Sequence, residues 1–162
     1  MRLGKSIVVA AFGMVTVLAL TVTASATPPS GLRGDTPVRG TLPNDIRAKA
    51  DGVKFQTSGA IDVVVQTLTV GPGGYSGWHT HPGVVLVVVE SGLVTLQVGC
   101  SINTYSAGQS FYETGLTPVM ARNMTAHDYV LRVTYVVPKG AAVRRDVLAI
   151  DAPQCDDQEH QD

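Results

Sequence analysis

Residues 73–83 read GGYSGWHTHPG, and the β-branched run from Val84 to Val89 follows directly. The glycines and the proline form turns, whereas the run after them has the composition of a buried strand. His79 and His81 lie two positions apart. Because residues i and i+2 of a strand project from the same face, both imidazoles are expected to point the same way and to offer their nitrogens to one ion.

Short strand patterns continue along most of the chain. The residues from Ile46 to Ala50 alternate between apolar and basic, Asp51-Gly52 supplies a hairpin turn, and Val53 to Phe55 resume the alternation. Further β-branched runs occupy residues 61–70, 84–89, 93–98 and 129–137. No window over residues 38–137 shows a long apolar repeat at helical spacing, so the sequence predicts a nearly all-β domain. Strands of this length and spacing close into a sandwich, a jelly roll or a barrel.

The N-terminus has the layout of a secretory signal peptide. Arg2 and Lys5 precede a mostly apolar run from Ile7 to Val22, and small residues follow up to Ala26. A membrane anchor is the alternative, but a spanning helix needs about 20 predominantly apolar residues, and this run is shorter and interrupted. We therefore expect residues 1–26 to be removed on export, which leaves a secreted protein with no membrane attachment.

Loss of 26 of the 162 residues leaves 136, which is enough for one domain with a hydrophobic core. The formal net charge changes from −1 to −3, because two basic residues and no acidic ones are removed. No nucleic-acid partner is expected, since such proteins usually carry a basic patch. Residues 27–37 are interpreted as a flexible leader, 38–138 as the barrel domain, and 139–162 as a C-terminal segment with a disordered acidic tail.

The chain has two cysteines, Cys100 and Cys155, and both remain after cleavage. An oxidising compartment favours a disulfide between them, and two independent thiols are the alternative. The cysteines alone do not predict a metal site, because neither lies in a Cys-x-x-Cys motif.

The histidine stretch resembles the first conserved motif of the cupin family. That motif consists of Gly, five residues, His-x-His, three or four residues, Glu, six residues and Gly. Gly73, His79, His81 and Gly92 fall in register with it. The same register places Val85 where the family carries its glutamate.

Residues 108–123 resemble the second cupin motif more weakly. Gly108 and Asn123 match, but Thr114 replaces the proline, Leu116 the glycine and Val119 the histidine. The resemblance spans residues 38–138. It implies an all-β fold, a double-stranded β-helix or jelly-roll barrel.

The resemblance also implies that His79 and His81 are two of four metal ligands. The other two positions hold Val85 and Val119, so we expect a degenerate site that binds a divalent transition metal weakly or not at all. The alternative is that the two histidines only line a pocket, hydrogen-bonded to backbone or water.

Two other side chains are candidates for an additional ligand. Glu113 lies six residues before Val119, and His127 lies just after the second motif. A carboxylate at a strand end is more often a solvated surface group.

Three functions are compatible with this sequence. The first is a non-catalytic module that binds a small molecule in an apolar barrel interior, with Val85, Val87 and Val89 on one face. The second is a metal-dependent cupin enzyme of the dioxygenase or isomerase type that uses His79 and His81. The third is a structural protein that forms homodimers. No Gly-x-Ser-x-Gly elbow or phosphate-binding loop supports a serine hydrolase or a nucleotide-binding protein.

Overall fold

The computed structural model describes residues 25–155, so the expected signal peptide lies almost entirely outside the described residues, as does the expected acidic tail. The strands are β1 (Ser30–Gly34), β2 (Val38–Leu42), β3 (Arg47–Ala50), β4 (Val53–Gln56), β5 (Ile61–Tyr75), β6 (His79–Thr80), β7 (Val84–Ser91), β8 (Leu93–Val98), β9 (Ser101–Ser106), β10 (Ser110–Thr114), β11 (Val119–Arg122), β12 (Tyr129–Pro138) and β13 (Arg145–Asp146). One turn of 3₁₀ helix, η1, covers Ala149–Asp151. Within residues 25–155, no helix has the length and apolar character needed to cross a membrane.

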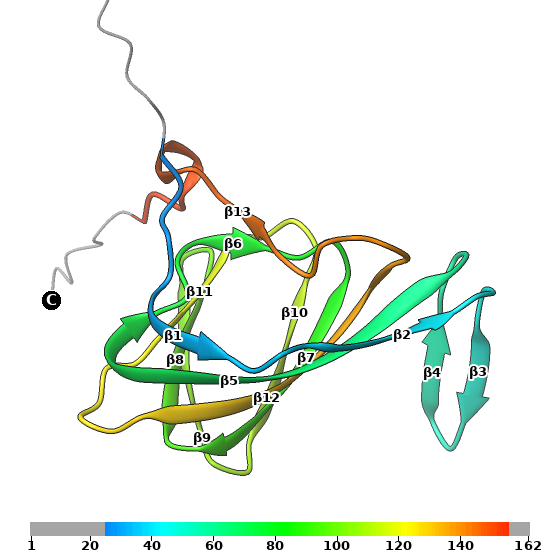
Figure 1. The fold of residues 1–162 in the computed structure, drawn as a ribbon, viewed down its shortest axis with the longest axis horizontal. Helices are drawn as coiled ribbons and strands as arrows, with labels where there is room; N and C mark the ends of the chain where they lie inside the picture. Colours follow the sequence, from blue (N-terminus) through cyan, green and yellow to red (C-terminus); the bar gives the residue numbers. More distant parts are fainter. Residues whose placement is uncertain (1–24, 156–162) are drawn as a thin grey trace, which may run out of the picture.

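Eleven of the strands form one antiparallel sheet that curls into a nearly closed barrel (Figure 1). One wall has the order β10-β7-β12-β5, with β1 and β2 paired to β5. The other wall contains β9, β8, β11, β6 and β13. The predicted all-β jelly-roll barrel is therefore confirmed.

Strand β5 passes from one wall to the other through a glycine-rich bend. Its first ten residues pair with β12, whereas Tyr75 at its end pairs with Arg122 of β11. A Cβ atom on Gly74 would lie 2.7 Å from Val70 Cγ1 and 2.9 Å from the Ser30 carbonyl oxygen. Only glycine fits where the backbone at position 74 approaches Val70 and Ser30 this closely. The bend leads the chain directly into β6 and its histidine.

Alternation along β7 separates the inside of the barrel from the outside. Val85, Val87 and Val89 are at most 3% exposed and form the core with side chains from the facing wall, whereas Leu86 and Val88 are about half exposed on the outer face. The interior valine face predicted from sequence is confirmed. The expected homodimer stays a prediction.

The expectation of a flexible leader over residues 27–37 is wrong for Ser30–Gly34, which form β1. This strand pairs with the second half of β5, and Leu32 packs against the core. The polar composition of the segment did not reveal this pairing, because an edge strand of a sheet needs few apolar side chains when its backbone supplies the contacts.

The predicted hairpin with the Asp51-Gly52 turn is also confirmed. Both turn residues have positive φ angles, 46° and 84°, as a two-residue hairpin loop with the strand twist requires. Strands β3 and β4 form a separate two-stranded sheet that projects away from the barrel (Figure 1).

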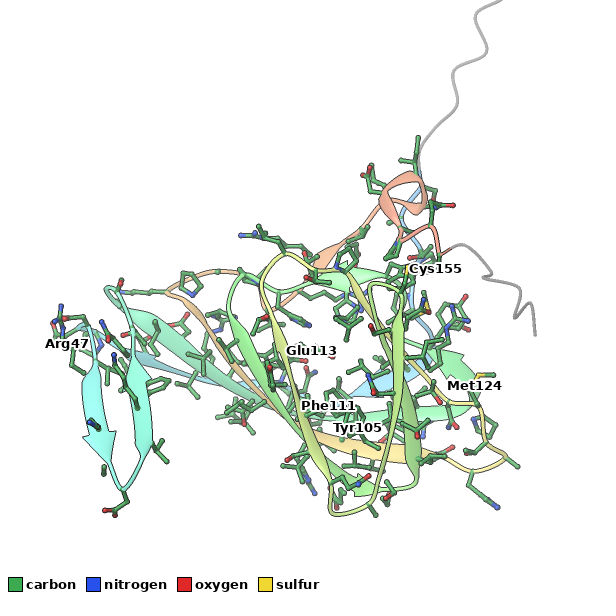
Figure 2. All side chains as sticks on the ribbon, turned by 180° about the vertical axis from the view of Figure 1, so that it is seen from behind. Arg47, Tyr105, Phe111, Glu113, Met124 and Cys155 are labelled. Atoms are coloured by element: carbon green, nitrogen blue, oxygen red, sulfur yellow. A yellow bond between two sulfur atoms is a disulfide. The ribbon has the colours of Figure 1, made fainter. Side chains whose placement is uncertain are left out.

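The C-terminal segment returns to the barrel and is tied to it. A disulfide joins Cys100, after β8, to Cys155, with the two Cα atoms 5.4 Å apart (Figure 2). Between them, β13 pairs with β6, so this segment covers the strand that carries the first histidine.

Candidate metal centre

Both motif histidines point into the barrel. His79 belongs to β6 and His81 follows it, and their side chains are 7% and 5% exposed. Their rings lie 4.8 Å apart between centroids and are nearly perpendicular. Strand β6 is held between β11 and β13, since His79 is paired with Val119 on one side and Asp146 on the other. The shared face expected from the His-x-His spacing is therefore present.

Backbone carbonyls fix the orientation of both rings. His79 Nδ1 lies 2.9 Å from the Gly77 carbonyl oxygen, and His81 Nδ1 lies 2.6 Å from that of Val143. A carbonyl only accepts, so in each ring Nδ1 carries the proton that is donated. Nε2 is then the atom with a free lone pair in both neutral rings. Metal-binding histidines are commonly held in this way by their second nitrogen.

Glu113 joins the histidines from a different strand. In the β10–β7 pairing it lies directly opposite Val85, and its side chain is 8% exposed. Along β10, Phe111 and Glu113 both point into the barrel (Figure 2). The carboxylate therefore enters the site from the strand next to the one where the cupin motif has its glutamate.

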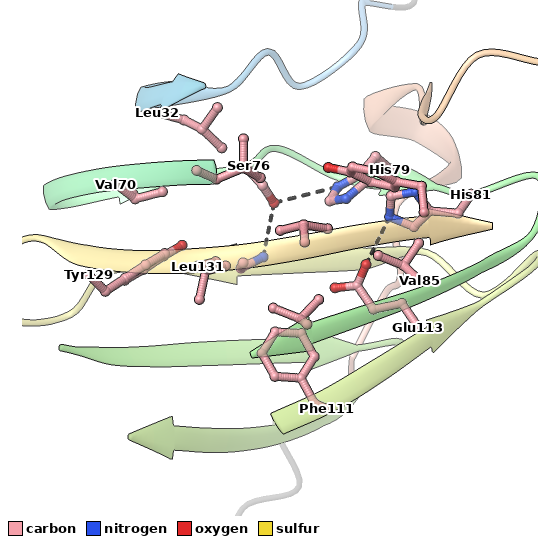
Figure 3. A pocket seen from close by; sticks show the side chains of 15 residues that line it. Leu32, Val70, Ser76, His79, His81, Val85, Phe111, Glu113, Tyr129 and Leu131 are labelled. Atoms are coloured by element: carbon pink, nitrogen blue, oxygen red, sulfur yellow. Dashed lines mark hydrogen bonds and ion pairs between the residues drawn. The ribbon is translucent and has the colours of Figure 1, made fainter. Parts of the chain in front are cut away.

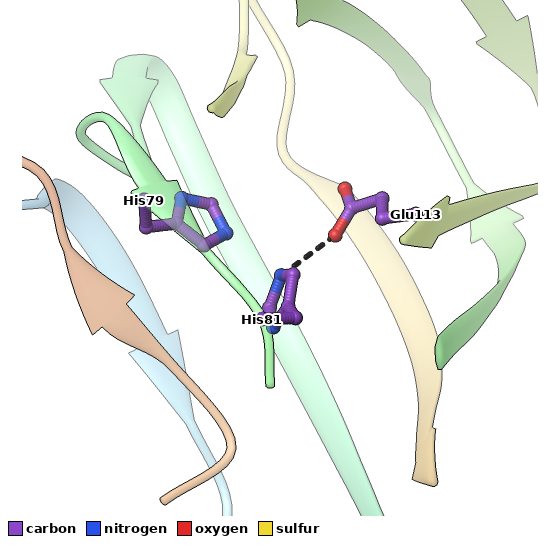
Figure 4. Close-up of side chains that lie close together, drawn as sticks. All are labelled: His79, His81 and Glu113. Atoms are coloured by element: carbon purple, nitrogen blue, oxygen red, sulfur yellow. Dashed lines mark ion pairs between the residues drawn. The ribbon is translucent and has the colours of Figure 1, made fainter. Parts of the chain in front are cut away.

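The three side chains form one cluster. A ligand atom from each of His79, His81 and Glu113 can be chosen so that all lie within 4.8 Å of one another (Figure 4). The Glu113 carboxylate oxygen Oε2 is 2.8 Å from His81 Nε2. The sequence named Glu113 as a possible additional ligand, and the structure places it beside the histidines.

His81 and Glu113 contact each other at the distance of a buried ion pair, but without the geometry of a hydrogen bond (Figure 4). His81 Nε2 is buried and has no hydrogen-bond partner among the described residues, although the carboxylate oxygen is only 2.8 Å away. With the proton on Nδ1, a nitrogen lone pair and a carboxylate face one another, which requires a proton or a cation between them. Two imidazoles and one carboxylate are a donor set of catalytic zinc sites and of non-haem iron sites. The residues present therefore fit a divalent transition metal.

Burial keeps the His79 ring neutral, which is the form that binds a metal ion. Loss of solvent, together with the positive charge of Arg144, lowers the pKa of His79 to about 4. The ring is thus neutral at neutral pH, with its Nε2 lone pair available.

The two valines that replace family ligands are both buried. Val85 is 1% exposed and Val119 is 2% exposed. Val119 is paired with His79, and its side chain belongs to the hydrophobic core. The expected loss of these two ligands is consistent with the structure, and Glu113, named from the sequence as a possible additional ligand, lies beside the two histidines.

His127, the other candidate ligand, does not reach the cluster. It is exposed in the loop between β11 and β12, and its backbone carbonyl accepts a hydrogen bond from the side chain of Asn123. Asn123 is 1% exposed, and its amide also donates to the Val70 carbonyl oxygen. The second-motif asparagine therefore has a structural role in closing this loop.

The cluster lines a small cavity inside the barrel (Figure 3). Its volume is about 40 Å³, and apart from the three site residues and Ser76 its walls are aliphatic and aromatic. The hydroxyl of Tyr129 is buried in this wall and has no hydrogen-bond partner among residues 25–155. Burial raises the pKa of this group, which keeps it a neutral donor. A space of this size holds an ion and a few waters, whereas typical ligand pockets have volumes of about 300 Å³ or more.

No family model matches this chain, and no curated protein matches it. Solved structures are similar to it. One is the cupin_2 domain of an XRE family transcriptional regulator from Enterobacter cloacae, with 19% identity over 46% of this chain and 80% of that chain and a TM-score of 0.41. Another is a conserved protein with a double-stranded β-helix domain from Klebsiella pneumoniae, with 18% identity, 69% and 83% coverage and a TM-score of 0.46. A third is the polyketide cyclase RemF from Streptomyces resistomycificus, with 18% identity, 52% and 60% coverage and a TM-score of 0.46.

At these identities the similarity concerns the fold alone. The strand pairings described above give the same fold independently, with β5 crossing between two antiparallel walls. The chain is a double-stranded β-helix barrel, and cupin-type barrels are among the solved structures that it is similar to.

Proposed function

We propose that this protein is an exported metal-binding barrel of the cupin type that acts on small molecules at a centre formed by His79, His81 and Glu113. The observation that carries the proposal is the buried contact between His81 Nε2 and the Glu113 carboxylate, which lie 2.8 Å apart without a hydrogen bond. A divalent cation would be the common partner of both atoms.

The ligands are the Nε2 atoms of the two histidines and the carboxylate of Glu113. Three protein ligands leave coordination positions open, and a metal with open positions supplies Lewis-acid or redox chemistry to a bound molecule. The chain itself supplies the orientation of the rings through Gly77 and Val143, and a dry aliphatic wall that excludes bulk water.

The size of the interior supports this proposal over an apolar ligand bound deep inside the barrel. A cavity of about 40 Å³ leaves no room for a sizeable apolar molecule. A substrate would instead reach the site from the barrel mouth. Side chains of Ser76, His79 and His81 also line a second, larger hollow of about 250 Å³.

The proposal is tested by metal titration of the protein freed of metal by a chelator. Zn²⁺ and Co²⁺ are each expected to bind one per chain, and the Co²⁺ form should change its visible spectrum when azide is added, because an open position accepts the anion. The double variant His79→Ala, His81→Ala should bind neither ion stoichiometrically. The matched control is His127→Ala, which removes an exposed histidine outside the cluster and should behave as the wild type. Equal metal binding by the double variant would overturn the proposal.

The proposed export rests on the first 26 residues and on the disulfide, which is typical of oxidising compartments. Mass spectrometry of the protein recovered from the medium of producing cells should give a chain that begins at Thr27. Thr27 Oγ1 accepts a hydrogen bond from the Trp78 amide, so the new N-terminus would remain attached to the barrel. Recovery of the full chain inside the cell only would contradict export.

A further inference from the structure

Arg144 lies at the mouth of the site and has unused hydrogen-bonding capacity. Its Nε donates to the Asp146 carboxylate at 2.5 Å, but its Nη2 is buried and has no partner among the described residues. A guanidinium carries five N–H donors in a planar fork, and a buried donor without a partner is rare in native structures. The geometry at Arg144 therefore calls for a partner that is not part of the described chain.

The free end of Arg144 borders the route to the histidines. Arg144 lines the hollow of about 250 Å³ together with His79 and His81, and six residues of this hollow also line the inner cavity that contains Glu113. The residues shared by both are Leu32, Leu68, Ser76, His79, His81 and Tyr135. The two spaces therefore share a wall that contains both histidines, with Glu113 lining only the inner cavity and Arg144 only the outer hollow.

The charges at this mouth favour an anion. Arg144 and a divalent ion would carry three positive charges, against one negative charge each from Glu113 and Asp146. Asp146 is half exposed and already contacts the Nε edge of the guanidinium, so it leaves the Nη2 donor free. Gln66, also in the hollow, donates its side-chain amide to the Asp35 carbonyl oxygen and does not compensate the Arg144 charge.

The other walls of the hollow are apolar, with Leu32, Leu68 and Val143 among them. We propose that the small molecule bound here is a carboxylic acid with a short apolar body, whose carboxylate is held by Arg144 while its other end faces the histidines. The planar fork of arginine matches a carboxylate through two parallel hydrogen bonds. This inference rests on the proposed function, because it assigns the substrate class of the same site.

The test uses propionate as the probe, propionamide as its neutral counterpart, and inorganic phosphate as a second anion. Binding is followed by ligand-observed NMR on the full mature protein in its Zn²⁺-loaded and metal-free forms, and the metal content of every sample is measured. Three variants are compared with the wild type: Arg144→Gln, Arg144→Lys and Arg145→Gln. Arg145 is the matched control, because it directly follows Arg144, begins β13 and is exposed.

Propionate is expected to bind the loaded wild type at least tenfold more tightly than propionamide or phosphate. Arg144→Gln should lose at least tenfold in propionate affinity at unchanged metal content, Arg144→Lys should be intermediate because it keeps the charge without the fork, and Arg145→Gln should be unchanged. Equal propionate affinity of the wild type and Arg144→Gln, with metal retained in both, would overturn the inference, as would equal binding of propionate and propionamide.

A failure of the proposed metal site would give a different result from a failure of the Arg144 inference. If the metal analysis finds no Zn²⁺ in the wild type, the proposed function fails, and the metal-free samples decide about Arg144. Propionate binding that Arg144→Gln abolishes would still support anion recognition by this residue, whereas no propionate binding in the metal-free wild type would overturn it.

Discussion

Within the described part of the chain, two carboxylates are buried, Asp62 at the start of β5 and Glu113 in β10, and their surroundings differ. Asp62 is 2% exposed and accepts hydrogen bonds from Arg39 Nη1 at 2.6 Å, from Thr41 Oγ1 at 2.6 Å and from the Gly140 amide at 2.8 Å. Glu113 is 8% exposed, and its polar neighbour is a histidine nitrogen with which it makes no hydrogen bond.

The comparison separates structural polar groups from functional ones. The partners of Asp62 come from β2 and the C-terminal segment, so its charge joins parts of the fold and is fully compensated. The cluster of His81, Glu113 and Arg144 instead has two buried nitrogens without partners among the described residues. A fold keeps such groups at a cost in stability, which is typical of binding sites.

The largest effect on stability is expected from the disulfide, because it holds the C-terminal segment that contacts both Asp62 and His81. The segment after β12 supplies the Gly140 amide to Asp62 and the Val143 carbonyl to His81, and the disulfide fixes its end. The double variant Cys100→Ser, Cys155→Ser opens a loop with a sequence separation of 55. It should lower the free energy of unfolding by about 4 kcal/mol on the chain-entropy estimate. Denaturant unfolding measures this, and a loss below about 1 kcal/mol would show that the segment is held without the disulfide.

The second prediction exchanges each carboxylate for its amide in the metal-free protein. Asp62→Asn should lower Tm by about 5–10 °C, because it removes a charge that three donors contact. Glu113→Gln should change Tm by no more than about 2 °C, because the glutamine amide can donate a hydrogen bond to His81 Nε2 and so replaces the shared proton of the metal-free protein. Thermal unfolding followed by circular dichroism compares them, and equal losses would remove the distinction between the two sites.

With Zn²⁺ present, Glu113→Gln rather than Asp62→Asn should be the variant that loses stabilisation by the metal. Zn²⁺ at 100 times its Kd should stabilise the wild type by about 2.7 kcal/mol through binding to the folded state. Asp62→Asn should show the same gain, whereas Glu113→Gln should lose most of it at the same Zn²⁺ concentration. Differential scanning calorimetry with and without Zn²⁺ provides the measurement. A full gain in Glu113→Gln would exclude Glu113 as a ligand.

The smallest expected effect is on the pH dependence of stability in acid. The hydrogen bonds from Thr41, Gly140 and Arg39 lower the pKa of Asp62 from 3.8 to about 2. The unfolded chain therefore binds this proton more readily. The stability that Asp62 contributes is complete above about pH 5 and is lost as the pH falls toward 2. Between pH 5 and pH 2, the free energy of unfolding should fall more steeply with decreasing pH for the wild type than for Asp62→Asn. Identical curves would contradict this account of Asp62.

Most of the fold was predictable because its strands carry their own signals. The β-branched runs that became β5, β7, β8 and β12 were recognised from alternation and composition, and the Asp51-Gly52 turn from its residue types. Strand β1 was not, because its stability comes from backbone pairing to β5 and from Leu32. Local sequence does not report such a long-range contact.

The candidate site was predictable only in part for the same reason. The spacing of His79 and His81 fixes their common face within one strand. The position of Glu113 in the site depends on the β10–β7 register, which places it opposite Val85, and on the inward direction of its side chain. Arg144 gave no signal at all, because it lies directly before β13, a strand of two residues whose position depends on pairing with β6.

The central claim is that His79, His81 and Glu113 bind one metal ion together. Elemental analysis of the mature protein, purified without a metal-binding tag, tests it most directly. The account predicts close to one transition metal ion per chain in the wild type and in His127→Ala, and almost none in Glu113→Gln or in His79→Ala, His81→Ala. Metal-free wild type that also fails to take up Zn²⁺, Co²⁺ or Fe²⁺, or full metal content in the double histidine variant, would contradict it.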